Sequence, residues 1–227
     1  MSHKDNVKKL YADWSGVYDQ SSENSLSVLV EKGVLIEAVN PKEGEAILDL
    51  GCGTGRITAQ IFEFNKTVVG VDLSDQMLEV ARKKLPEASF IQADILSLPF
   101  ADNSFDKVVS SLVFQFLPDI EKPLKEVSRV LNPGGTLFIT DFIKDAPLDW
   151  SNVKYQKEKI FKGSIGELSK FRSAKEYEET ANLVGLKLMK MIPLRVRESA
   201  KELLTENSWN EIQGSFASVI FVFKNQK

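Results

Sequence analysis

The segment from Ile47 to Thr58, ILDLGCGTGRIT, places three glycines two residues apart between a short apolar run and a helix-like pattern. Glycine at a strand-to-helix turn permits positive φ angles and has no Cβ atom, so backbone N–H groups and the helix N-terminus can approach a ligand closely. A tight turn that only packs a helix against a strand is the alternative that needs no ligand. The segment predicts a strand-turn-helix unit with a ligand site at the turn.

Short apolar runs alternate with helical patterns from Ala46 to Phe142, which is typical of βαβ units in a parallel sheet. The expected strands of this part are AILDL, TVVGVD, SFIQAD, FDKVVSSLVF and TLFITDF. A helix at SAKEYEETANLVG and two more strands, LKLMKMIPLRV and FASVIFVFK, are expected after it. The pattern predicts the α/β class.

A chain of 227 residues is long enough for one domain with a full core, so a single domain over 1–227 is predicted. Residues 1–40 read as helical and are expected to form an N-terminal lid, and residues 41–142 form the ligand-binding core. The alternation then breaks for about thirty residues, and a connection of that length is usually a lid or a binding segment. Residues 143–175 are therefore a predicted substrate lid, and 176–227 supply the final helix and strands.

Composition argues against several classes of protein. A net charge of −3 and a pI of about 5.4 provide no general attraction to nucleic acid. One cysteine cannot form an internal disulfide, and one cysteine with one histidine cannot build a Cys/His zinc site, so no metal and a reducing, cytoplasmic location are expected. The start, MSHKDNVKK, lacks the apolar stretch of a signal peptide, and no apolar run is long enough to span a bilayer.

Acidic residues stand at the ends of the next two predicted strands. Asp72 follows Gly51 by 21 residues, the spacing at which an acidic side chain meets ribose hydroxyls in nucleotide-binding folds. Asp94 ends the third strand in the same way. Because open α/β sheets bind ligands at the carboxyl ends of their strands, these residues predict a nucleoside site at one sheet edge.

The glycine spacing differs from a dinucleotide fingerprint, G-x-G-x-x-G, because the third glycine, Gly55, comes one residue early. With Asp49 in front, the loop reads D-x-G-x-G-x-G. Here the chain resembles the class I S-adenosylmethionine-dependent methyltransferases, and among them the small-molecule branch that includes the ubiquinone and menaquinone biosynthesis methyltransferases. The resemblance covers Ala46 to Asp141 through this loop and three further blocks, VVGVDLSDQML, FIQADILSLPFADNSFD and RVLNPGGTLFITD.

The resemblance implies a Rossmann-like, doubly wound, mostly parallel seven-stranded sheet with an antiparallel last strand, and S-adenosyl-L-methionine as cofactor. It also implies roles for individual residues: the methionine moiety against Asp49, Gly51, Cys52, Gly53 and Gly55, the ribose on Asp72, the adenine between Leu73 and Met77 and near Asp94 and Ile95, the methyl group beside Ser110 or Ser111, and Tyr18 over the carboxylate. Structural alternatives remain: Asp49 only ties the loop together, Met77 is helix core, and Tyr18 is a surface aromatic.

No histidine is available as a general base. Where the family often has two adjacent histidines after the fourth strand, this chain has Gln115 and Phe116, and the one histidine, His3, lies in a terminus that is expected to fray. The remaining candidates for a catalytic role are Asp141, Tyr11 and Gln115, and for each a purely structural role is an equal alternative.

The predicted function is transfer of a methyl group from S-adenosylmethionine to a small-molecule acceptor through an oxygen, nitrogen or carbon atom. The segment 151–175 carries seven basic residues against two glutamates, which indicates either a solvated lid face or a surface that attracts an anionic acceptor or a lipid headgroup. A nucleotide-dependent oxidoreductase and a noncatalytic S-adenosylmethionine-binding scaffold are the alternative functions. The oligomeric state stays open.

Overall fold

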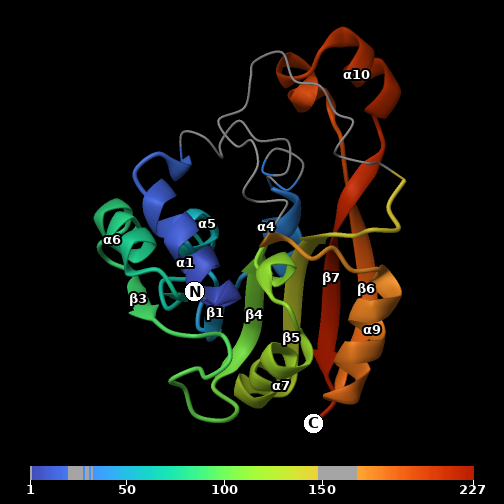
Figure 1. The fold of residues 1–227 in the computed structure, drawn as a ribbon. Helices are drawn as coiled ribbons and strands as arrows, with labels where there is room; N and C mark the ends of the chain where they lie inside the picture. The colour runs from blue at the N-terminus through green and yellow to red at the C-terminus, as the bar shows by residue number, and fades with distance from the viewer. Residues whose placement is uncertain (1, 20–27, 29–30, 32, 148–167) are drawn as a thin grey trace.

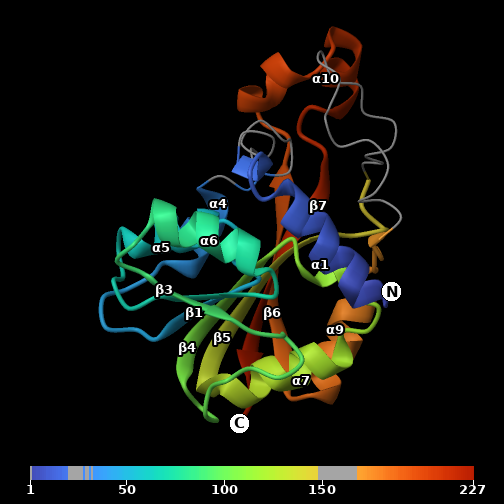
Figure 2. The ribbon, with the colours of Figure 1, turned by 60° about the vertical axis from the view of Figure 1, so that its left-hand side comes forward.

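The computed structural model describes residues 2–19, 28, 31, 33–147 and 168–227. They form a twisted sheet with helices on both faces (Figures 1 and 2). The strands are β1 (Ile47–Leu50), β2 (Val69–Asp72), β3 (Ser89–Gln92), β4 (Phe105–Ser111), β5 (Leu131–Phe142), β6 (Leu186–Arg195) and β7 (Phe216–Asn225). The helices are α1 (His3–Trp14), α4 (Val34–Val39), α5 (Arg56–Phe62), α6 (Asp75–Lys84), α7 (Glu121–Val130), α9 (Ala174–Leu183) and α10 (Glu206–Ile212), with 3₁₀ turns η1 (Phe114–Phe116) and η3 (Glu198–Leu203).

The strand order is β3-β2-β1-β4-β5-β7-β6. β1 pairs in parallel with β2 on one side and with β4 on the other, and β7 is antiparallel to both β5 and β6. The predicted mostly parallel, seven-stranded sheet with an antiparallel last strand is confirmed. The direction in which the strands are laid down reverses between β1 and β4, and a crevice forms at the carboxyl ends of strands at such a switch point.

Alternate residues of the central strands serve two separate cores. Ile47 of β1 packs with Leu35 of α4 and Ile61 of α5, whereas the next residue, Leu48, joins the cluster that contains Tyr177 of α9. All five side chains are at most 1% exposed, and burying an aliphatic or aromatic side chain of this size contributes roughly 1.5–3 kcal/mol. The near-continuous apolar strands of the sequence are thus explained by a sheet that is covered on both faces.

The predicted lid over residues 1–40 divides into two parts that differ in burial. α4 belongs to the core, since Leu35 and Val39 are each 1% exposed. α1 has no buried residue and lies over the carboxyl ends of the strands, against α6 (Figure 2). Residues 20–27, 29, 30 and 32 lie outside the described part of the chain. Of the described residues within 1–40, only residues 2–19 lie over the carboxyl ends of the strands as the predicted lid would.

His3 does not lie in a frayed terminus, so that expectation is wrong. The side chains of Ser2 and Asp5 form a capping box that begins α1 at His3. The His3 ring Nε2 lies 2.9 Å from the carbonyl oxygen of Phe116, and the Lys4 ammonium lies 2.6 Å from the Asp94 carboxylate. Both contacts tie the start of α1 to loops at the carboxyl ends of the strands.

The fifth strand begins earlier than predicted. It starts at Leu131, directly after α7, and includes Asn132–Gly135, which precede the predicted strand TLFITDF. The buried Asn225 amide explains this extension, because its Nδ2 donates to the carbonyl oxygens of Leu131 and Asn132 at 3.1 and 3.2 Å. A side chain near the end of the chain therefore holds the start of this strand.

The connection between the last two strands contains elements that the pattern did not predict. η3 and α10 lie there, and Trp209 and Ile212 of α10 pack into the same core cluster as α4 and α5. Most of the predicted lid at 143–175 falls on residues 148–167, outside the described residues. Within the described ranges no helix is long and apolar enough to cross a membrane.

Deletion of residues 1–19 is expected to lower the melting temperature by only a few degrees, because every side chain of α1 stays at least partly exposed. Deletion of residues 1–40 is the matched comparison and removes Leu35 and Val39 from the core, which should cost several kcal/mol. Thermal and urea unfolding would measure both effects. Equal destabilisation by the two deletions would show that α1 is part of the core after all.

Candidate functional site

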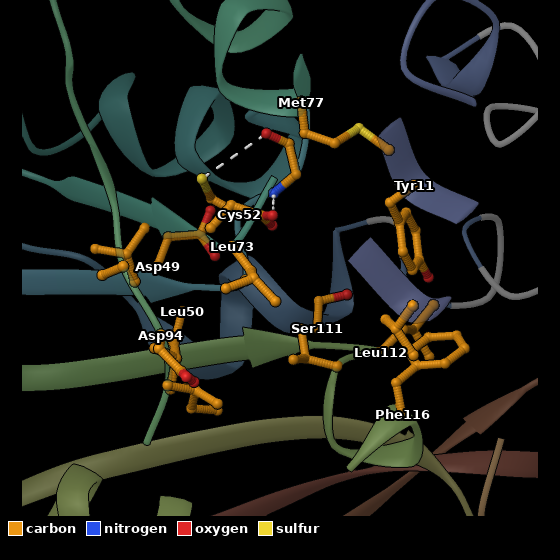
Figure 3. A pocket seen from close by; sticks show the side chains of 18 of the residues that line it. Tyr11, Asp49, Leu50, Cys52, Leu73, Met77, Asp94, Ser111, Leu112 and Phe116 are labelled. Carbon is orange, nitrogen blue, oxygen red and sulfur yellow. Dashed lines mark hydrogen bonds between the residues drawn. The ribbon is translucent and has the colours of Figure 1, made fainter. Parts of the chain in front are cut away.

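A cavity opens at the switch point between β1 and β4, beneath α1. Its wall comes from the loops that follow β1, β2, β3 and β4 and from one side of α1. Figure 3 shows Asp94 and Leu73 toward one end, Tyr11 and Phe116 toward the other, and Ser111 between them. Twelve of the residues predicted to form the site line this cavity: Tyr11, Tyr18, Asp49, Gly51, Cys52, Gly53, Asp72, Leu73, Met77, Asp94, Ile95 and Ser111.

The glycine loop lies too close to the β4 loop for a side chain at its first position. A Cβ atom on Gly51 would lie 2.3 Å from a methyl group of Val113, and the φ angle of Gly51 is +75°. Gly55 has a different task, since a Cβ there would meet Ala81 and Phe90 at 3.2 Å, and Gly55 does not line the cavity. Gly55 therefore serves close packing of a helix against a strand, the alternative that needs no ligand. Gly51, in contrast, lets the turn form part of the cavity wall.

Two carboxyl groups without an ion-pair partner among the described residues face the cavity beside this loop. Asp72 accepts hydrogen bonds from the backbone N–H groups of Gly53 at 2.9 Å and Ser74 at 2.8 Å. Asp49 accepts from the Thr58 hydroxyl at 2.6 Å, and burial raises the pKa of Asp49 from 3.8 to about 7. Burial also raises the pKa of Asp72. A cationic ligand would relieve this cost of burying charge.

The end of the cavity that holds Asp94 is apolar around a single carboxylate. Asp94 accepts from the backbone N–H of Leu96 at 3.0 Å and pairs with Lys4 of α1. Leu73, Met77 and Ile95 line the same region, and Met77 is 1% exposed. Met77 is thus both a buried residue of helix α6 and part of the cavity wall, so its two interpretations do not exclude each other. Apolar side chains around a single polar group suit a purine ring.

Aromatic and aliphatic side chains form the wall on the side of α1. Tyr11 meets the ring of Phe116 edge-on, with centroids 5.5 Å apart, and lies 5.9 Å from the ring of Tyr18. Burial raises the pKa of Tyr11 and of Tyr18, so both phenols are neutral near pH 7. Leu112 lines this wall with a φ angle of +59°, a strained conformation for a leucine that is found mainly at functional sites.

Besides Gly55, three predicted residues do not line the cavity and lie behind its wall. Asp141 is 1% exposed and accepts from the Tyr177 hydroxyl and from its neighbour Phe142, and burial raises its pKa to about 7. The Gln115 amide donates to the carbonyl of Leu112 at 3.2 Å. Ser110 donates to the carbonyl of Leu50 at 2.9 Å. This geometry favours the structural alternative for Asp141 and Gln115, and it favours Ser111 over Ser110 as the cavity residue.

Cys52 is a small residue of the turn and not a reactive thiol. It is 7% exposed, and burial raises the pKa of its thiol well above the usual value, so the nucleophilic thiolate is disfavoured. Within the described part of the chain, no group of three or more His, Cys, Asp or Glu side chains is placed to hold a metal ion.

Sequence reasoning missed three charged residues of this region: Lys4, Glu31 and Arg56. Lys4 and Arg56 line the cavity, and Arg56 forms a 2.6 Å ion pair with the buried Glu31. Arg56 could have been found, because it directly follows Gly55 and so begins the helix behind the glycine loop. Lys4 and Glu31 carry no such local signal, since only the tertiary fold brings them to the cavity.

Comparison with known proteins shows which family the chain belongs to. The family of methyltransferase domains matches residues 48–139. An uncharacterized methyltransferase of Oceanobacillus iheyensis is 30% identical over 152 residues, which cover 62% of this chain and 71% of that protein. The chain belongs to the methyltransferase family. The family resemblance inferred from the glycine loop and the three further blocks is confirmed.

Other relatives are matched over a shorter share of their length. A demethylmenaquinone methyltransferase of Paenarthrobacter aurescens is 36% identical over 120 residues, which cover 53% of this chain and 47% of that protein. The chain spans between 46% and 60% of the length of the first curated relatives. The fold is shared with an S-adenosylmethionine-dependent methyltransferase of Mesorhizobium loti, with a TM-score of 0.69 at 20% identity over 88% of this chain and 100% of that one.

The free energy of unfolding of the unliganded methyltransferase is expected to fall as the pH rises from about 4 to about 7. The folded state holds the protons of Asp49 and Asp141 up to a pKa of about 7, whereas the ordinary aspartate pKa of 3.8 applies once unfolding exposes them. The folded state therefore binds more protons in this window and loses stability as they leave. Urea unfolding at several pH values would measure the slope.

Asp49→Asn keeps the hydrogen bond from Thr58 and removes the titration, so this variant should show a shallower slope. Asp75→Asn is the matched control, because the Asp75 side chain is 51% exposed. Identical slopes in the wild type and in Asp49→Asn would show that Asp49 titrates normally in the folded protein.

Proposed function

We propose that this protein transfers a methyl group from S-adenosylmethionine to a small-molecule acceptor bound beneath α1. The supporting observation is that Asp49 and Asp72, two carboxyl groups without an ion-pair partner among the described residues, flank the glycine loop. S-adenosylmethionine brings a sulfonium and an ammonium group to such a wall, which favours its binding. The pyrophosphate of a dinucleotide would meet repulsion there, which argues against the oxidoreductase alternative.

The residues of the cavity fit the parts of this cofactor in order. We assign the ribose hydroxyls to Asp72, the adenine to the apolar end with Leu73, Met77, Asp94 and Ile95, and the methionine moiety to the glycine loop and Asp49. Each backbone N–H bound by Asp72 fixes its carboxylate in place, which prepares it to accept from ribose hydroxyls. When bound, the cofactor supplies an electrophilic methyl group on a positively charged sulfur.

The acceptor is assigned to the wall of Tyr11, Leu112, Val113, Phe116 and Leu117. Side chains of this kind suit an apolar or planar molecule, and they exclude water from the reaction. Alignment of a nucleophile for in-line displacement can supply roughly 7–11 kcal/mol, so positioning can carry much of the rate enhancement. Electron-rich rings such as Tyr11 would also favour a sulfonium ion by cation–π attraction.

Proton removal is not assigned to a side chain of this wall. Tyr11 is a neutral phenol near pH 7, and Asp141 and Gln115 lie behind the cavity. An acceptor that is already deprotonated, or that attacks through a carbon or an amine of low pKa, needs no base. We further propose that the enzyme is cytoplasmic and needs no metal. An anionic acceptor is one alternative, since the segment 151–175 is basic, but much of that segment lies outside the described residues. The acidic pI of about 5.4 disfavours nucleic acid as the acceptor.

Asp72→Ala is expected to weaken the binding of S-adenosylhomocysteine by roughly 1–3 kcal/mol, because it removes hydrogen bonds to a charged group. Isothermal calorimetry would measure the dissociation constants. Asp75→Ala, at the exposed start of α6, is the control and should bind as the wild type does. Should S-adenosylhomocysteine bind to Asp72→Ala with unchanged affinity, the ribose must lie elsewhere, and stoichiometric NADH binding by the wild type would favour the oxidoreductase.

A further inference from the structure

The η1 turn, residues 114–118, comprises η1 and the residues directly after it, and it contacts both the cavity and the segment that precedes α9. Phe116 and Leu117 of this turn line the cavity, and the Phe116 ring meets Tyr11 of α1. Arg172 lies on the other side of the turn, shortly before α9, and does not line the cavity. It is only 3% exposed. The proposed methyl transfer assigns no role to this buried arginine.

The Arg172 guanidinium joins the two ends of the η1 turn. Its Nη1 donates to the carbonyl oxygen of Phe114 at 3.0 Å, and its Nη2 donates to the carbonyl oxygen of Leu117. Hydrogen bonds from a charged group are stronger than those between neutral groups, and a guanidinium holds its donors in one plane. Removing Arg172 would take these partners away from the carbonyl groups, which is costly at a buried site. One side chain thus fixes the shape of the turn.

The other carbonyl oxygens of the η1 turn are bonded as well. Lys170 donates from its backbone N–H to Gln115 at 2.7 Å and from its ammonium group to Pro118 at 2.9 Å. Phe116, between them, accepts from His3 Nε2 of α1 at 2.9 Å. Five successive carbonyl groups therefore accept either from the segment before α9 or from the first residue of α1. The η1 turn joins these two segments, which lie far apart in the sequence.

The position of Arg172 is itself fixed by the sheet and by α9. Its backbone carbonyl accepts from the N–H of Lys144, just after β5, at 3.0 Å, and the next residue, Ser173, forms the capping box that begins α9. Its charge also lies near a buried carboxyl group. Burial raises the pKa of Asp141 to about 7, and the Tyr177 hydroxyl and the Arg172 guanidinium oppose that rise. Arg172 therefore reaches the turn from a rigid base.

We propose that Arg172 is a positioning residue, which acts through the η1 turn on both the acceptor wall and α1. It holds the two wall residues of the turn in place, and through the bond from His3 it keeps α1 over the bound ligand. This inference rests on the proposed function, which assigns a nucleoside and an acceptor to the cavity. Lys4 and Tyr11 of α1 line that cavity, so a loosened α1 lets a bound nucleoside leave faster.

Hydrogen exchange of the unliganded protein tests the connection without any ligand. Arg172→Met removes the donors at similar length, and exchange of the backbone amides in residues 3–14 and 112–118 should become faster in both segments, by roughly tenfold or more, as expected for lost hydrogen bonds to a charged group. Faster exchange in 112–118 alone would overturn the connection to α1. Unchanged exchange in both segments would overturn the positioning role.

Two further variants separate positioning from general stability. Arg129→Met is the matched control, because Arg129 also donates to two backbone carbonyls, those of Leu98 and Phe100, and neither residue lines the cavity. It should leave exchange in α1 and in the η1 turn as in the wild type, and equal effects of both arginine variants would contradict a specific role of Arg172. Arg172→Lys keeps the charge without the planar fork and should restore part of the protection, and it replaces Arg172→Met if that variant does not fold.

A double-mutant cycle tests whether Arg172 acts on α1 through the bond of His3. His3→Ala should speed up exchange in α1 and leave the segment before α9 unchanged. In the double variant with Arg172→Met, exchange in α1 should be slower than the product of the two single effects predicts, because both changes weaken the same connection. Effects that multiply would show that the two residues act independently and would overturn this path.

The release of S-adenosylhomocysteine tests the consequence for the site. Surface plasmon resonance should show that Arg172→Met releases this nucleoside at least roughly fivefold faster than the wild type while the association rate changes little, since a loosened cover acts mainly on dissociation. Arg129→Met should behave as the wild type does. An unchanged dissociation rate in Arg172→Met would contradict the effect on the ligand. If the wild type does not bind S-adenosylhomocysteine but the exchange data show the connection, the proposed function fails and the role of Arg172 in the fold stands.

Discussion

The parallel pairing of β1 with β2 on one side and β4 on the other determines where the candidate residues lie. It brings the loops after these strands to one edge of the sheet, so that residues from Asp49 to Val113 surround one crevice. The close approach of these loops depends on Gly51, whose missing Cβ leaves room for Val113. Without that space the glycine turn and the β4 loop could not pack against each other to form one continuous wall of the cavity.

Charge then divides the crevice into regions with different chemistry. Asp49 and Asp72 lie by the glycine loop without an ion-pair partner among the described residues, whereas Arg56 pairs with the buried Glu31 and Lys4 pairs with Asp94. A ligand that carries positive charge and an amino-acid end complements this arrangement better than a pyrophosphate does. The α1 side adds neutral phenols and apolar side chains, which suit the alignment of an acceptor more than acid-base chemistry.

The core of the fold could be predicted from the sequence because its signals are local. The glycine loop, the apolar runs from Ala46 to Phe142 and the strand-end aspartates each occupy a few adjacent residues, and the parallel sheet follows from their alternation. η3 and α10 were missed because tertiary packing, not periodicity, decides their place, as the burial of Trp209 shows. α4 was assigned to the lid because a helical pattern does not show what its apolar face contacts.

The candidate site could likewise be predicted only where its residues carry a local signal in the sequence. Asp72 and Asp94 were found from their spacing and strand-end positions, and the other residues of the β1, β2 and β3 loops from the family resemblance. Asp141 was also named as a candidate, although its side chain accepts from Tyr177 behind the cavity wall. Glu31 and Lys4 reach the cavity only through contacts between elements far apart in the chain. His3 shows the same limit, since its bond to Phe116 joins the first helix to the β4 loop.

Incubation of the protein with methyl-labelled S-adenosylmethionine and a fractionated small-molecule extract tests the central claim most directly. The account predicts that label enters an extract fraction and that S-adenosylhomocysteine forms in equal amount, both only when the protein is present. If S-adenosylmethionine binds but neither product forms with any fraction, the protein is a binding scaffold and the claim of methyl transfer is contradicted.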